Sequence, residues 1–283
     1  MRCMFRLELN KALKNKFFYV AIIIGSFITV LSLIYNINIY QKNFSVDTEN
    51  VNPMYGAFSL FNLWIGGEPF SFGSAAYFCV FPLLVSIPYG WSYCEEKRSG
   101  YIRMVIVRSG KKAYLLSKYI AVFVSGALAM VIPLLFNFCI SALFFPATTP
   151  TPVYCTSNGI FYESLMSMIY YSSPFLYVLF YLCIDFVFGG LISCISYATA
   201  CFVKHRTVAV IVPLFCLLSF HYLRQFIYIS PEVRYKEISP LFFLRPVQSV
   251  YNVSWEIILG EAIVLFLITF FFSVIWERKN EVY

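Results

Sequence analysis

The sequence has few charged residues for its length. Asp, Glu, Lys and Arg make up 12% of its 283 residues, against roughly 25% in a soluble domain, while hydrophobic residues make up 60%. One core of this size cannot bury so much apolar surface, so lipid must cover much of it. The net charge of +7 does not indicate a nucleic-acid partner, because the basic residues flank the apolar runs instead of forming one patch.

The sequence also lacks the motifs of several enzyme classes. It contains no Gly-x-x-x-x-Gly-Lys-[Ser/Thr], so it has no Walker A loop to hold ATP and Mg. Neither His-Glu-x-x-His nor Gly-x-Ser-x-Gly occurs. The two histidines, His205 and His221, would lie about 24 Å apart along a helix and could not share a metal ion within one chain. We therefore predict no catalytic residue, no metal and no cofactor in this chain.

Six apolar stretches are each long enough to cross a membrane. A helix rises about 1.5 Å per residue, so roughly 20 apolar residues span the hydrocarbon core. The stretches cover about residues 17–39, 70–93, 113–145, 174–203, 207–228 and 257–276. We expect an all-α integral membrane protein with six transmembrane helices in a single domain, residues 1–283.

The basic residues predict how these spans are oriented. Of the 21 Lys and Arg residues, 15 precede the first span, follow the last one, or lie between spans two and three or four and five, and Lys118 lies near the start of span three. Positively charged connections stay in the cytoplasm. We therefore predict a multi-pass protein of the cell (cytoplasmic) membrane, surrounded by lipid, with both termini in the cytoplasm.

The segment before the first span predicts a short amphipathic helix. Apolar residues that include Leu9 and Leu13 recur at helical spacing, and Arg6 lies on a separate basic face. Such a helix suits the inner headgroup layer. The alternative is a topology anchor with incidental periodicity.

The connection between spans two and three, residues 95–112, predicts a second short helix. Ser99 is placed to cap its start and Gly110 to end it. The alternative is a plain positive-inside loop. The acidic pair Glu95–Glu96 counts against that alternative, because acidic residues contribute little to topology.

These features together resemble a type 2 ABC exporter permease: an amphipathic N-terminal helix, six spans and a short helix between spans two and three. The likeness covers the whole chain in architecture and is specific over Pro82–Lys118, where an apolar span ends in Glu, a Gly follows, and a short apolar helix and a basic turn lead into Tyr-Leu-Leu-Ser-Lys. Long first and second outer loops depart from the family pattern and leave the cargo open.

The resemblance implies partners and contact residues. Residues 2–16 would be a connecting helix, and the coupling helix would dock on a cytosolic ATP-binding subunit, present in two copies and holding ATP and Mg. A second permease chain, identical or homologous, would complete the path. The implied ATPase-contact residues are Glu95, Glu96, Arg98, Gly100, Arg103 and Arg108.

The implied function is that of the permease subunit of an ATP-driven bacterial exporter, which is not itself an enzyme. We expect a peptide or an amphipathic small molecule as cargo. One alternative is a membrane sensor or immunity protein that binds its ligand without transport. A less favoured alternative is an intramembrane enzyme.

Asp185 lies inside the fourth predicted span, and His221 and Arg224 lie inside the fifth. An unpaired charge in the membrane costs several kcal/mol, so partners are expected. We predict that Asp185 pairs with His221 or Arg224, or else forms a local bond to Tyr181 or a serine hydroxyl.

The proline-flanked segment 239–246, in the third outer loop, is strongly apolar. It either dips back into the membrane or forms an ordinary packed outer loop.

Overall fold

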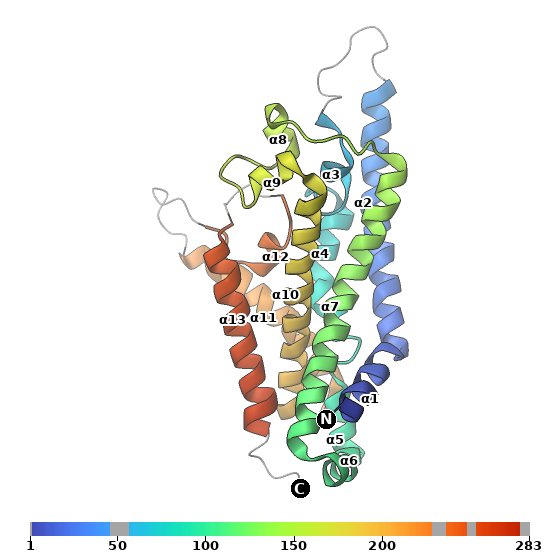
Figure 1. Ribbon diagram of the computed structural model, residues 1–283, viewed down its shortest axis with the longest axis vertical. Coiled ribbons are helices and arrows are strands. Elements are labelled where there is room, and N and C mark those ends of the chain that lie inside the picture. Colours follow the sequence, from blue (N-terminus) through green and yellow to red (C-terminus); the bar gives the residue numbers. More distant parts are fainter. Residues whose placement is uncertain (1, 46–56, 228–235, 248–252, 278–283) are drawn as a thin grey trace.

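The computed structural model describes residues 2–45, 57–227, 236–247 and 253–277, and these residues form helices without strands (Figure 1). Five helices are long and apolar enough to cross a membrane, as expected of an all-α multi-pass membrane protein. They are α2 (Lys16–Ser45), α7 (Lys111–Phe144), α10 (Pro174–Phe202), α11 (Arg206–Ile227) and α13 (Trp255–Phe270), which continues as the π-helical η3 (Phe271–Trp276). Residue 228, the last of the predicted fifth span, lies outside the described residues.

The predicted span over residues 70–93 is not one long helix. In its place, α4 (Phe72–Ser86) has 15 residues, or about 22 Å. A turn over residues 87–91 then separates α4 from α5 (Ser92–Arg98). Pro88 lacks the N–H that would continue the helical hydrogen bonds, and its carbonyl oxygen accepts a 2.8 Å bond from the Asn15 side chain.

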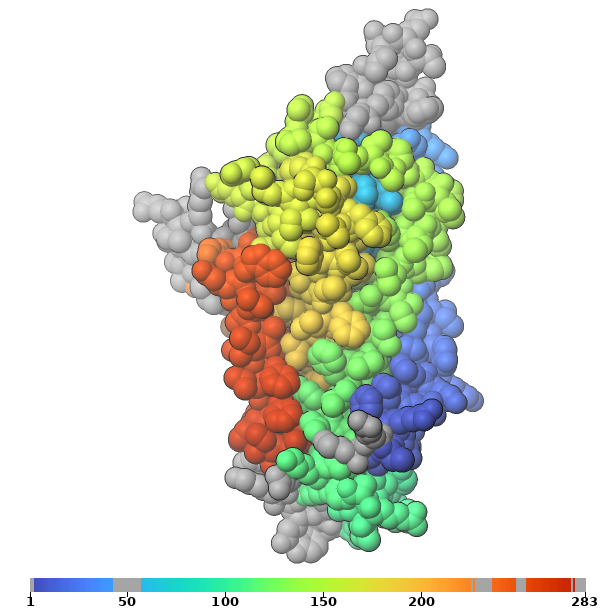
Figure 2. Space-filling model, viewed as in Figure 1, coloured from blue at the N-terminus to red at the C-terminus, as the bar shows by residue number. Residues whose placement is uncertain are grey.

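Two helices, α7 and α10, form the centre of the bundle. They approach closely because small residues face each other, with Gly126 of α7 against Ser193 of α10, and Gly189 of α10 against Met130 of α7. The outer helices α2, α11 and α13 leave more of their apolar surface exposed, and α13 stands along one side of the molecule (Figure 2). This exposed apolar surface is suited to contact with lipid.

The short helices gather at the two ends of the bundle (Figure 1). At one end, which we call the basic end, lie α1 (Arg2–Leu13), α5, α6 (Tyr101–Ser109) and the end of η3. At the other end lie α3 (Leu60–Leu63), η2 (Pro152–Tyr154), α8 (Cys155–Asn158) and α9 (Ser167–Ser172). The first and last described helices therefore end on the same side of the bundle.

The segment over residues 236–247 folds back among the long helices. Its helix α12 (Pro240–Phe243) packs against α4 and α11. The Phe243 ring lies 5.1 Å from that of Phe188, about 21 Å along α10 from its first residue. The segment therefore packs among the long helices, and its predicted position relative to the membrane stays a prediction.

The crossing of α2 and α4 yields a stability test. A Cβ at Gly73 would lie 2.3 Å from the backbone nitrogen of Ser32, and backbone cannot rotate away. We expect Gly73→Ala to destabilise the protein by about 2 kcal/mol, as overpacking does. The control is Gly260→Ala in α13, where an added Cβ would have no neighbouring atom within 4 Å. This substitution should change the free energy of unfolding by under about 1 kcal/mol. The stability of both variants is measured in detergent as the temperature at which the monodisperse size-exclusion peak is lost. Equal behaviour of the two variants would contradict the close crossing.

Candidate functional site

A buried ion network joins α1, α5 and α7 at the basic end. The side chains of Glu8 and Lys118 are both fully buried. The Lys118 ammonium lies 2.5 Å from Glu96 Oε2 and 3.5 Å from Glu8 Oε2. One lysine on a central helix therefore holds carboxylates from the N-terminal helix and from α5.

Two tyrosines complete the hydrogen bonds of these carboxylates. The Tyr89 hydroxyl donates to Glu8 Oε2 at 2.8 Å, and the Tyr114 hydroxyl donates to Glu96. The Lys118 ammonium also lies 4.6 Å from the centre of the Tyr89 ring. Such additional partners are what a buried ion pair requires, because taking each ion out of water costs several kcal/mol.

A second lysine connects the network to α6. The Lys11 ammonium donates to the Tyr101 hydroxyl at 2.9 Å and lies 3.4 Å from Glu8 and 3.6 Å from Glu96. Burial alone lowers the pKa of Lys11, but the Tyr101 bond and the two carboxylates together raise it above its ordinary value. The network therefore contains two carboxylates and two ammonium groups, which balance in charge.

Helix α5 bonds to three other parts of the chain through three successive residues. Glu96 enters the buried network, while Glu95 pairs with Arg206 at the start of α11 at 2.9 Å. Lys97 lies 3.5 Å from Glu277, directly after η3, and the same carboxylate accepts a 2.7 Å bond from Tyr93. Successive side chains of a helix point about 100° apart, so one turn can reach three neighbours.

Helix α6 presents a free face at the basic end. Ile102 is buried beneath it, whereas Arg103, Met104, Val107 and Arg108 are exposed. The predicted helix ahead of Gly110 is thus present, but Gly100 is its N-cap, with a left-handed φ of 73° that glycine adopts without strain. The exposed face mixes apolar and basic side chains, a composition suited to contact with another protein.

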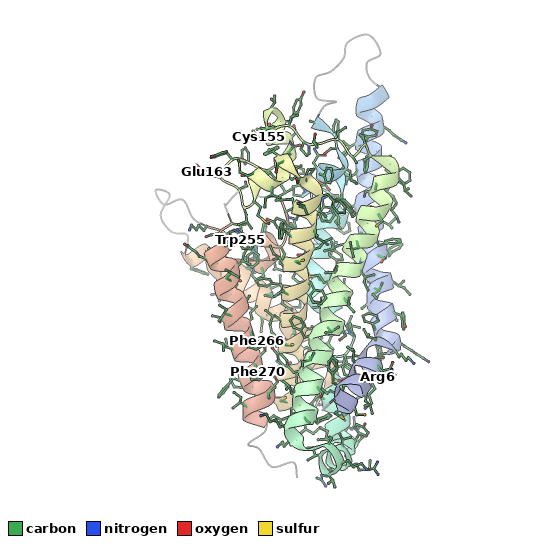
Figure 3. The ribbon with its side chains drawn as sticks, in the orientation of Figure 1. Arg6, Cys155, Glu163, Trp255, Phe266 and Phe270 are labelled. Carbon is green, nitrogen blue, oxygen red and sulfur yellow. The ribbon has the colours of Figure 1, made fainter. Side chains whose placement is uncertain are left out.

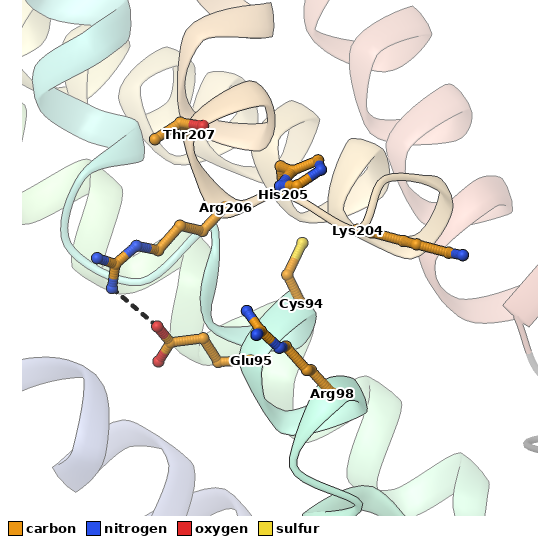
Figure 4. Close-up of a pocket in the computed structure, with 7 residues that line it drawn as sticks. All are labelled: Cys94, Glu95, Arg98, Lys204, His205, Arg206 and Thr207. Carbon is orange, nitrogen blue, oxygen red and sulfur yellow. Dashed lines mark hydrogen bonds and ion pairs between the residues drawn. The ribbon is translucent and has the colours of Figure 1, made fainter.

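The residues predicted to contact an ATPase lie on two parts of the basic end. Glu95, Glu96 and Arg98 of α5 line one cavity, and Glu96 also enters the buried network. Glu95 and Arg98 face the connection between α10 and α11 as well (Figure 4). Arg103 and Arg108 are on the free face of α6, which Gly100 begins. The structure therefore does not bring the whole predicted set together on one surface.

The N-terminal helix packs against the bundle through one face. Met4, Glu8 and Ala12 are its buried residues, and α1 packs against α7. Leu9 and Leu13 are half-buried. Arg6 is exposed on the outer side of α1 (Figure 3). The packed face thus contains a carboxylate that finds its partner on α7.

The ionisable residues inside the spans do not pair as predicted. Arg224 forms an ion pair with Glu237, and His221 Nδ1 lies 2.9 Å from the Ser239 hydroxyl. Both partners come from the segment that re-enters the bundle before α12. Asp185 is buried, and its Oδ1 atom has no hydrogen bond within the described part of the chain.

The aromatic ring of Phe242 contacts the His221 and Arg224 side chains of α11. The His221 ring stacks on it at 4.9 Å with an angle of 7° between planes, and the Arg224 guanidinium lies 4.6 Å from its centre. Glu237 neutralises the charge of Arg224, and the Phe242 ring covers the face of its guanidinium group. Arg224 therefore has partners other than Asp185.

Among the residues of these networks that sequence reasoning did not single out are Glu8, Tyr89, Tyr114, Lys118 and Glu237. Two of them carried a usable signal. Glu8 is the only acidic residue among the first 46 residues, in a basic stretch, and Lys118 stands inside an apolar run. Charges out of pattern at such positions indicate buried partners.

Metal binding requires several ligand side chains close together, and thiol chemistry requires an ionised cysteine. No three His, Cys, Asp or Glu side chains among them lie where they could hold a metal ion. Burial raises the pKa of the Cys94 thiol, which donates to the Val203 carbonyl oxygen at 3.2 Å. A protonated, hydrogen-bonded thiol is a poor nucleophile.

Adjacent glutamates provide a matched test of the network. Glu96→Gln leaves the buried Lys118 ammonium with Glu8 as its one remaining carboxylate, so we expect a loss of about 3 kcal/mol. Glu95→Gln removes an ion pair whose side chains are 50% and 58% exposed, which is worth about 0–1 kcal/mol. Thermal unfolding of the purified variants in the same detergent measures the difference. Equal losses would show that the Glu96 network contributes no more than a surface pair.

Comparison with known proteins places the chain in a family. Among curated proteins, none matches the sequence. The family described as "Protein of unknown function (DUF2705)" matches residues 58–283, a range that includes α5, α6 and α7 but not α1. Because this match covers most of the chain, the protein belongs to the DUF2705 family.

Proposed function

We propose that this protein is the permease subunit of an ATP-driven exporter, with ATP bound and hydrolysed by a separate cytosolic subunit. The observation that carries the proposal is the position of α6. Its outer face is free, with Val107 87% exposed. On its inner side, Ile102 is buried against the bundle and Tyr101 accepts a hydrogen bond from Lys11 of α1. A helix held in this way can receive force from a partner and pass it on.

The contacts of α5 and α6 support a path for that force. A displacement of α6 acts on α1 through the bond between Tyr101 and Lys11. Through α5 it acts on α7 at Lys118, on α11 at Arg206 and on the end of the last helix at Glu277. Nucleotide binding in the partner would then bias two arrangements of the spans, which is the physical content of coupling.

We infer six membrane crossings for the working protein, with both termini in the cytoplasm. The second crossing would consist of α4 and the turn after it. Together they have 20 residues, which is enough to cross the hydrocarbon core if the turn is covered by protein. The turn does pack inside the molecule, where Gly90 lies against Ser196 of α10. The basic end would face the cytoplasm, as the positive-inside rule requires.

The same proposal includes the partners and the cargo. Two ATPase subunits and a second permease chain, identical or homologous, would complete the transporter. The expected cargo is a peptide or an amphipathic small molecule. An apolar groove of about 430 Å³ between α7, α10 and α13, lined in part by Tyr119, Phe123 and Phe266, supports an apolar or amphipathic cargo.

Two exposed valines at opposite ends of the bundle test the partner contact. Val107→Asp places a charge in the middle of the free face of α6, so we expect at least a tenfold loss of ATPase co-purified in mild detergent. Val153→Asp is the matched control, since Val153 is 83% exposed at the other end and should retain the ATPase. Mass spectrometry identifies the captured subunit by its Walker A sequence.

The proposal fails if the unchanged protein brings down no such ATPase from its native membrane after cross-linking. It also fails if Val107→Asp and Val153→Asp retain the same amount. A membrane sensor or an immunity protein would give the first result, and it would bind its ligand without nucleotide.

A further inference from the structure

A cavity of about 400 Å³ opens beside α5, at the start of α11 (Figure 4). Its charged lining comes from two distant parts of the sequence. Arg98 belongs to α5, whereas Lys204 and His205 lie in the connection from α10 to α11 and Arg206 is the first residue of α11. A second cavity of about 500 Å³ shares Arg98, Lys204 and His205 and extends toward the end of α10.

The charges around the first cavity are not balanced. Arg98, Lys204 and Arg206 contribute three positive charges, and Glu95 is the one carboxylate among the described residues that line the cavity. Glu95 pairs with Arg206 at 2.9 Å. Like charges held around one space repel each other unless an anion joins them. The start of α11 adds the positive end of a 22-residue helix.

Positive-inside topology does not explain this convergence. That rule concerns only which side of the membrane a basic residue occupies. It is satisfied equally well by basic side chains that spread apart in water. Here a residue of α5 and residues more than 100 positions later line the same cavity, so the fold has built a concave basic site.

The location of the cavity identifies the kind of anion. It lies where two candidate spans end, since α10 stops at Phe202 and α11 starts at Arg206. This is the level of the lipid headgroups. The second cavity adds apolar walls from Val203 and from Phe202, whose ring is 56% exposed. Basic pockets between spans, with apolar surface beside them, suit phospholipid headgroups.

We propose that this cavity binds the phosphate headgroup of an anionic phospholipid, with Arg98, Lys204 and Arg206 contacting the phosphate and an acyl chain lying along Phe202. Arg98 thereby has a role other than ATPase contact. The Glu95 carboxylate competes with the phosphate for Arg206, because both are anions and the Arg206 guanidinium bonds one of them in this structure.

The test uses the full-length protein, delipidated in detergent and titrated with phosphatidylglycerol or phosphatidylcholine. Native mass spectrometry counts the lipid that stays bound. We expect preferential retention of phosphatidylglycerol. Arg98→Gln combined with Lys204→Gln should weaken it about tenfold, since each basic residue near an anionic surface contributes on the order of 1 kcal/mol.

Two further variants separate a built site from general surface charge. Arg103→Gln combined with Arg108→Gln removes the same charge from the same end of the bundle and should leave retention unchanged. Glu95→Gln frees Arg206 and should increase retention of phosphatidylglycerol. All four positions changed in the charge-removal variants are exposed, so folding is not at risk, and a size-exclusion profile checks it.

The inference is overturned if both lipids are retained equally, or if the two double variants lose phosphatidylglycerol to the same extent. It is also overturned if inorganic phosphate at 10 mM, roughly the strength of a weak anion site, displaces the lipid, because the site would then hold a free phosphate. No ATPase takes part in the measurement, so its result is independent of the proposed exporter function.

Discussion

The structure of the basic end depends on one buried ammonium group. Lys118 is fully buried in a helix that otherwise reads as membrane-spanning, and removing such a group from water costs several kcal/mol. Carboxylates and tyrosines brought to it offset that cost. Glu8 reaches it from α1 and Glu96 from α5, so both elements are fixed where the lysine requires them. The position of α6, which follows α5 directly, depends on the same requirement.

Much of the fold could be predicted from the sequence because lipid imposes simple rules. The spans at 113–145 and 174–203 appear as α7 and α10 with nearly the predicted bounds, since length and apolarity alone decide them. The second span could not be predicted in the same way. A hydropathy profile does not show that Pro88 interrupts the helical hydrogen bonds. It also does not show that the Asn15 side chain, from another part of the chain, donates a hydrogen bond to the turn. The short helix before Gly110 was predictable because capping is local.

The networks of the site were less predictable, because their partners lie far apart in the sequence. Helical spacing predicts an amphipathic α1 with Leu9 and Leu13 on its apolar face, but it gives no partner for Glu8, which pairs with Lys118, 110 residues away. Asp185 and Arg224 lie on consecutive spans, and their positions along these spans favoured a pair between them. The actual partner, Glu237, arrives on a segment whose return into the bundle has no reliable sequence signal. Periodicity tells which residues share a face of one helix, but not which helix covers it.

The position of α5 bears on how the two proposed roles of the basic end relate. Its residue Glu96 is locked in the buried network, while Glu95, the next residue, has an exposed ion pair with Arg206 that is worth little in water. If a phosphate takes Arg206, Glu95 is released, whereas Glu96 stays bonded. A lipid at this cavity would therefore loosen α5 from α11 without loosening it from α7. In a transporter driven through α6, such a ligand would weaken the transmission of force to α11. The attachment of α6 to the bundle would not change, because Glu96 would stay bonded to Lys118 of α7.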